Sequence, residues 1–176
     1  MTSVSKSNAM NDRELPPPPA GNAARVPRVD EAAGLVSVGP DYLGREALLT
    51  PWAAQAWHHM RLSAAAAGVE LLLVSAFRSV ERQTAILAAK LAKGMSLETA
   101  LEYSAYPGFS EHHSGNAIDI GTPESCPLEE EFESTAAFDW LCRNAADFGF
   151  QLSYPRDHPT GIAYEPWHWC FHPSLA

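Results

Sequence analysis

Two segments far apart in the sequence carry side chains of the kind that a catalytic metal site uses. Residues 110–121 contain His112 and Asp119, and His168 follows near the C-terminal end, three positions after Glu165. Catalytic zinc sites take three imidazole or carboxylate ligands and leave a fourth position open for water. The two histidines and the aspartate would meet that count.

The spacing of the first two candidate ligands requires a bend in the chain. His112 and Asp119 lie seven positions apart, which would place them on opposite faces of a regular strand. Gly115 lies between them and permits the bend. Ile118 and Ile120 flank the aspartate, and a carboxylate in such a buried strand is costly without a partner. A bound cation would remove that cost.

Two further residues could take part in hydrolysis. Pro166 cannot donate to a strand ladder, so we expect Glu165 to precede the last strand and to turn toward the open metal position. There it could act as a general base on water and then as an acid to the leaving amine. Arg78 follows a buried apolar run and could stabilise an oxyanion or bind a substrate carboxylate.

Each of these residues also has an ordinary structural interpretation. A histidine in a polar loop is seldom a metal ligand, an aspartate in a strand often forms a local hydrogen bond, and an arginine after a strand can be a helix-end charge. The combination favours a metal site, but the spacing alone leaves both interpretations open.

The composition limits the class of protein. The 176 residues suit one domain, and 46% hydrophobic with 19% charged residues is typical of a globular chain. The net charge of −9 argues against a nucleic-acid partner, because such proteins need a basic face. Cys126, Cys142 and Cys170 lack a CxxC spacing, so we expect free thiols, with a bridge between the first two as the alternative. We also expect a monomer.

The N-terminal region differs from the rest. Residues 1–28 are polar and contain four consecutive prolines, which predicts a flexible arm followed by one domain over residues 29–176. Residues 7–9 resemble a cleavage scar, which would place the natural start at Met10. There is no apolar signal segment and no run of about 18 apolar residues, so we expect no transmembrane segment and a cytoplasmic location, with the periplasm or cell envelope as the alternative.

The periodicity predicts the elements that position these residues. We expect helices over about 51–67, 79–94, 96–103 and 134–149, and strands within 70–77, 117–120, 150–154 and 166–171. Because the elements alternate without a clean βαβ repeat, the best fit is an α+β domain with a small, mostly antiparallel sheet flanked by helices.

Three motifs of the chain resemble those of the zinc D-alanyl-D-alanine peptidases of the VanY and VanX type, which share a fold with the hedgehog signalling domain. The family pattern S-x-H-x-x-G-x-A-x-D is present without a gap over residues 110–119. The pattern E-x-x-H followed by an aromatic residue matches residues 165–169. A strand ending in S-G-Y/F-R-S with a later glutamine matches residues 75–79 and Gln83. The resemblance covers about residues 39–171 and implies the hedgehog/DD-peptidase fold.

The resemblance also implies roles for individual residues. His112, Asp119 and His168 would bind one zinc ion, Glu165 would be the base, and Arg78 would contact the transition state or a substrate carboxylate.

Ser110 and Gln83 would contact the substrate by the same resemblance, whereas His113 is expected to point away from the metal. Two departures from the family pattern bear on specificity. Ala76 replaces a glycine, and residues 169–173 read Trp-Cys-Phe-His-Pro where an Arg-Tyr pair is common.

The function that this resemblance implies is a zinc-dependent D-alanyl-D-alanine or L,D-carboxypeptidase that hydrolyses terminal bonds of bacterial cell-wall peptides. One alternative is an L-alanyl-D-glutamate endopeptidase of the phage-lysin kind, although the sequence has no separate wall-binding repeat. The other is a zinc-binding module that recognises peptides without cleaving them. The base and the arginine argue against this second alternative.

Overall fold

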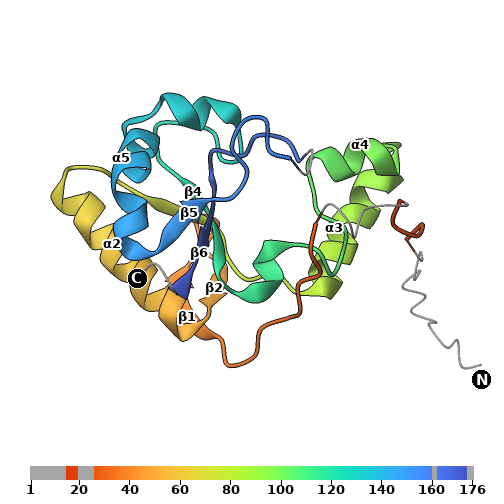
Figure 1. Ribbon diagram of the computed structural model, residues 1–176, viewed down its shortest axis with the longest axis horizontal. Coiled ribbons are helices and arrows are strands. Elements are labelled where there is room, and N and C mark those ends of the chain that lie inside the picture. The colour runs from red at the N-terminus through yellow and green to blue at the C-terminus, as the bar shows by residue number, and fades with distance from the viewer. Residues whose placement is uncertain (1–14, 20–25, 160–161, 174–176) are drawn as a thin grey trace, which may run out of the picture.

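A four-stranded antiparallel sheet forms the centre of the computed structural model, which describes residues 15–19, 26–159 and 162–173 (Figure 1). Its strands follow the order β3 (Leu72–Ser75), β4 (Ala117–Gly121), β6 (His168–Phe171) and β5 (Phe150–Leu152). The two middle strands are therefore β4 and β6. They contain two of the three candidate metal ligands.

Helices lie on both sides of this sheet. In Figure 1, α2 and α5 lie on one side, while α3 and α4 lie on the other. The helices are α2 (Pro51–Ala66), α3 (Val80–Ala92), α4 (Leu97–Glu102) and α5 (Ala136–Asn144), with short 3-10 turns η1 (Glu111–Ser114), η2 (Glu130–Ser134) and η3 (Ala145–Phe148). The expected α+β architecture with a small antiparallel sheet is confirmed.

Each of the four helices begins after a side-chain cap. The hydroxyl oxygens of Thr50, Ser79, Ser96 and Thr135 each accept a hydrogen bond from a backbone N–H in the first turn of the helix that follows. The last predicted helix is shorter than expected. Its α-helical part ends at Asn144 and continues as η3 up to Gly149, whose φ of +78° ends the helical path.

Side chains on β4 alternate between the core and the candidate site. Ile118 and Ile120 are buried in the cluster that includes Trp57 and Met60 of α2. Successive side chains on a strand point to opposite faces, so Asp119 faces the other side of the sheet. Across the ladder, Asp119 pairs with His168, which places both side chains on that side.

A second sheet was not predicted from the sequence. It is a hairpin of β1 (Val36–Pro40) and β2 (Glu46–Leu49). Its turn is held by Asp41, whose Oδ1 accepts hydrogen bonds from the backbone N–H groups of Leu43 and Arg45 at 2.9 Å each. Because β1 contains glycine and proline and is partly exposed, it lacks the apolar alternation of a strand.

The predicted arm can be compared with the structure only in part. Residues 1–14 and 20–25, including the suspected scar and Met10, lie outside the described residues. The carbonyl of Pro16 accepts a hydrogen bond from the Tyr106 hydroxyl at 3.0 Å. The division into arm and domain stays a prediction.

Two other predictions concern cysteines and membranes. Cys126, Cys142 and Cys170 form no disulfide. Within the described ranges, no helix has the length and apolar character needed to span a membrane.

Candidate active site and metal centre

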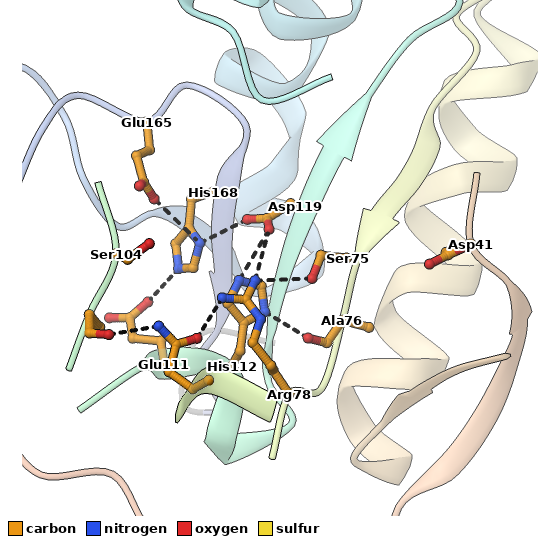
Figure 2. Close-up of polar contacts among 12 residues, drawn as sticks. Asp41, Ser75, Ala76, Arg78, Ser104, Glu111, His112, Asp119, Glu165 and His168 are labelled. Atoms are coloured by element: carbon orange, nitrogen blue, oxygen red, sulfur yellow. Dashed lines mark hydrogen bonds and ion pairs between the residues drawn. The ribbon is translucent and has the colours of Figure 1, made fainter. Parts of the chain in front are cut away.

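Three predicted ligands from three elements meet at one point. His112 of η1, Asp119 of β4 and His168 of β6 can each offer one ligand atom such that all three atoms lie within 4.8 Å of one another. Each residue is only 3% exposed. Figure 2 shows the two imidazoles converging on the aspartate.

Gly115 provides the expected bend. It lies directly after η1 with φ of +67°, a left-handed conformation that L-residues with a side chain rarely adopt. A Cβ atom at this position would lie 2.6 Å from Cδ2 of Leu35, so the leucine side chain would have to shift to make room for it. The turn returns the chain from His112 to the start of β4.

The ring of His112 has one nitrogen turned toward Asp119. Nδ1 lies 2.7 Å from the carbonyl oxygen of Ala76, which can only accept, so Nδ1 carries a proton and donates it. Nε2 lies 3.2 Å from Oδ2 of Asp119. Burial lowers the pKa of His112, which favours the neutral ring. In that form an imidazole lone pair faces a carboxylate oxygen, with no proton between them.

The ring of His168 lies between two carboxylates. Nδ1 is 2.9 Å from Oδ1 of Asp119, and Nε2 is 3.0 Å from Oε2 of Glu111. Burial opposes protonation, but the hydrogen bonds to Asp119 and Glu111 outweigh it and raise the pKa of His168 to about 10. Burial has the opposite effect on Asp119 and would raise its pKa, but the two histidines hold that pKa well below its usual value. The cluster therefore favours a positive charge among these groups.

These residues fit a zinc ion. Ligand atoms about 2.0–2.2 Å from a tetrahedral zinc lie about 3.4 Å apart, and the two nitrogen-to-oxygen distances in the cluster are 3.2 and 2.9 Å. Two nitrogens and one carboxylate also form the ligand set of catalytic zinc sites, which keep a fourth position open. His112 and Asp119 have no proton between them, whereas His168 and Asp119 share one. A bound cation could interact with all three groups in place of that proton.

Glu165 lies beside this cluster, on the segment that leads into β6. Its Oε2 is 3.8 Å from Nδ1 of His168. Its backbone N–H donates to the carbonyl of Tyr154 at 3.1 Å, and its own carbonyl accepts from His168 at 3.0 Å, which fix its position. Burial raises the pKa of Glu165 to about 7, although the nearby His168 opposes the shift. This carboxyl can hold or release a proton near neutral pH.

Arg78 reaches the cluster from the end of β3. Its NH2 group lies 3.7 Å from Oδ2 of Asp119 and donates to Oγ of Ser75 at 3.2 Å. Its NH1 group donates to Oε1 of Gln83 at 2.8 Å. Gln83 is fully buried, and its Nε2 donates to the carbonyl of Ala105 at 2.6 Å. In this arrangement Gln83 holds the guanidinium, and the predicted substrate contact of Gln83 stays a prediction.

A cavity of about 610 Å³ opens over these groups, within the usual size of a small-ligand site. Ser110 lines it, as do all three candidate ligands together with Arg78 and Glu165. Lys90 of α3 adds a second positive charge to the wall. The other wall residues come from α3, from the start of η2 and from the segments before η1, η2 and β6, so the cavity lies between the sheet and α3.

Two aromatic rings and a neighbouring carboxylate were not identified from the sequence. Tyr154 lines the cavity, and its ring centroid lies 4.8 Å from that of His168. Burial raises the pKa of Tyr154, which keeps its phenol protonated. Trp167 also lines the cavity. Metal-bound histidines usually donate their second N–H to a carboxylate or a carbonyl, but this rule does not tell from the sequence that Glu111 is the partner of His168.

His113 points away from the cluster, as expected. Its Nδ1 lies 2.5 Å from the carbonyl of Arg78, and its Nε2 accepts from the backbone N–H of Gly108 at 3.1 Å. The ring is fully buried. It connects the loop before η1 to the segment that carries the arginine.

With this geometry established, comparison with known proteins identifies the family. Residues 46–174 match the sequence profile of VanY, described as D-alanyl-D-alanine carboxypeptidase. The chain belongs to the VanY family. This confirms the resemblance read from the three motifs and makes the chain a member of a peptidase family.

Relatives and solved structures agree with this assignment. VanXYC of Enterococcus gallinarum, a bifunctional D-Ala-D-Ala dipeptidase and carboxypeptidase, is 34% identical over 128 residues, which cover 68% of this chain and 65% of that protein. The LdcB LD-carboxypeptidase is 34% identical with a TM-score of 0.72, over 80% of this chain and 69% of that chain. A VanY D,D-pentapeptidase variant solved with Zn(II) is 27% identical with a TM-score of 0.62, over 80% and 79%. The expected fold is confirmed.

The chain spans 22% to 65% of the length of the four curated relatives that it matches.

Proposed function

We propose that the protein is a zinc-dependent carboxypeptidase that removes the terminal D-alanine from bacterial cell-wall peptides, with one zinc ion per chain. The observation that carries this proposal is the buried Glu165 carboxyl, with a pKa of about 7, beside a cluster of His112, Asp119 and His168 at the base of a cavity. This is the ligand set and the base that peptide hydrolysis by metal-activated water requires.

Glu165 and Arg78 have different roles in the proposed hydrolysis. A zinc ion bound there would polarise the scissile carbonyl and activate a water molecule. Glu165 takes a proton from the attacking water as the new carbon–oxygen bond forms. It then delivers that proton to the amine nitrogen as the carbon–nitrogen bond breaks. The guanidinium of Arg78, held by Ser75 and Gln83, stabilises the negative charge on the carbonyl oxygen.

Two positive charges on one wall of the cavity can bind a substrate carboxylate, while Glu129 and Glu130 line the cavity elsewhere. Arg78 and Lys90 both line it, and Lys90 donates to Oγ of Ser104 at 2.6 Å. None of the ion pairs among the described residues involves Lys90. A peptide C-terminus would be attracted to this side of the cavity, which supports an exopeptidase over an endopeptidase. Ser110, also on the wall, would contact the same end of the peptide.

Relatives support both possible stereochemistries at the bond. VanXYC acts on D-Ala-D-Ala, whereas LdcB is an LD-carboxypeptidase. We therefore propose D-alanine as the released residue, next to either a D- or an L-centre, by a monomer acting on cell-wall peptides.

Mass analysis of purified muropeptides digested with the zinc-loaded protein tests the proposal. Loss of one alanine from pentapeptides identifies D,D activity, and loss from tetrapeptides identifies L,D activity. Cleavage between L-alanine and D-glutamate would replace the proposal with the endopeptidase function. Zinc binding without any product would replace it with the non-catalytic module.

A further inference from the structure

The two nitrogens of His168 have different partners, and only one of them faces the candidate metal position. Nδ1 lies 2.9 Å from Asp119 and 3.8 Å from Glu165, on the side of the cluster. Nε2 lies 3.0 Å from Oε2 of Glu111, on the opposite side of the ring (Figure 2). The ring is buried, so water does not compete for either nitrogen.

We propose that Glu111 is a positioning residue of the metal site, which holds the proton of His168 on Nε2 and leaves the lone pair of Nδ1 for the metal. This inference rests on the proposed zinc site. The two neutral tautomers of His168 are not equivalent here. With the proton on Nδ1, the ring would donate a hydrogen bond to Asp119. Neither Nδ1 nor that carboxylate oxygen would then be available to bind the metal. A carboxylate at Nε2 favours the other tautomer, because it can only accept.

Glu111 is itself held in place. Oγ of Ser153 donates to the same carboxylate oxygen at 2.6 Å, and the backbone N–H of Ser153 donates to the carbonyl of His168 at 3.2 Å. Ser153 follows β5, which is paired with β6. The serine, the carboxylate and the imidazole thus form one chain of hydrogen bonds that leads from η1 and β5 to the metal position.

His112 has an equivalent arrangement with a weaker partner. Its Nδ1 donates to the neutral carbonyl of Ala76, at 2.7 Å. Each histidine therefore has its outer nitrogen bound to an acceptor and its inner nitrogen turned toward Asp119. A charged acceptor gives the stronger hydrogen bond, so we expect Glu111 to contribute more to metal affinity than a neutral residue would.

Zinc affinity of Glu111→Gln tests the inference. The amide keeps the size of the side chain but can present its NH2 group to His168 and favour the wrong tautomer. We expect zinc to bind about 10- to 100-fold more weakly in competition with a fluorescent chelator, and the absorption bands of the cobalt-substituted protein to shift. Glu70→Gln, an exposed carboxylate away from the site, is the matched control and should bind zinc as the wild type does. Unchanged zinc affinity and an unchanged cobalt spectrum in Glu111→Gln would overturn the inference.

Two further measurements keep the test decisive if Glu111→Gln does not fold. Ser153→Ala should weaken zinc binding by a few-fold, because it frees the carboxylate. Nitrogen–proton NMR correlations of the zinc-loaded wild type should show His168 with its proton on Nε2, and a proton on Nδ1 would overturn the inference. Failure of the wild type to bind zinc would instead overturn the proposed function, so the two failures are distinguishable.

Discussion

Two glutamates lie on either side of His168, and their surroundings give them opposite character. Burial acts on both. At Glu111, hydrogen bonds from His168 and Ser153 overcome it and lower the pKa to about 2, whereas at Glu165 burial prevails and raises the pKa to about 7. The difference lies in the donors: Glu111 accepts two close hydrogen bonds, while Glu165 approaches His168 only at 3.8 Å. Carboxyl groups separated in this way can take different roles, one as a fixed anion and the other as a proton carrier.

Removal of the proton carrier should have the largest effect. Glu165→Ala is expected to lower turnover of a D-alanine-terminated peptide by about 10²- to 10⁴-fold, because it removes the carboxyl beside the cluster whose pKa lies near 7. Zinc content, measured by atomic emission, should stay at the wild-type level because the three ligands are intact. A normal rate in this variant would end the assignment of the base.

Zinc titration should separate the two glutamates. At limiting zinc, Glu111→Gln should show about 10- to 100-fold lower activity, because its affinity for the metal is reduced. Saturating zinc should restore most of that activity in Glu111→Gln but none in Glu165→Ala. If excess zinc rescues both variants or neither, the two residues do not differ in the way proposed.

Arg78 differs from both glutamates, because it would contribute a positive charge without carrying a proton. Arg78→Ala should lower kcat/KM by about 10²-fold through loss of stabilisation of the carbonyl oxygen, with unchanged zinc affinity. Gln83→Ala, which removes only the support of the guanidinium, should have a smaller effect in the same assay. A larger loss in Gln83→Ala than in Arg78→Ala would instead favour a direct role for the glutamine.

The smallest effect on chemistry, and a clear effect on stability, is expected at the turn that joins the segment of Glu111 to β4. Gly115→Ala should cost about 1–3 kcal/mol in free energy of unfolding, because its φ is +67° and an added Cβ would lie against Leu35. Urea unfolding measures this cost. Gly44→Ala is the control at a positive φ with open space, and it should cost less.

The grouping of the three candidate ligands could be predicted from the sequence better than the residues that support them. His112, Asp119 and His168 could be grouped because zinc ligands are restricted to a few residue types and the three motifs match a known family. Most helices could be placed from their caps and periodicity. The β1–β2 hairpin and the contact between Glu111 and His168 could not, since the hairpin lacks an apolar pattern and the contact joins residues that only the tertiary fold brings together.

The contacts of Gln83 also depend on the tertiary fold and could not be predicted from the sequence. The family resemblance implied a substrate contact for Gln83, which stays a prediction, and the sequence did not indicate its contacts within the protein. Only the packing of α3 shows that its amide is taken up by Arg78 and the carbonyl of Ala105.

The segment before the hairpin bears on where a minimal active fragment can begin. The family match starts at residue 46, yet the backbone N–H groups of Val29 and Ala32 donate to the carbonyls of Gly108 and His113, at 2.9 and 2.8 Å. Ala32 and Leu35 also pack against Gly115. A fragment that begins at residue 46 would lack these contacts to η1 and Gly115. An N-terminally truncated fragment should therefore keep residue 29 and everything after it.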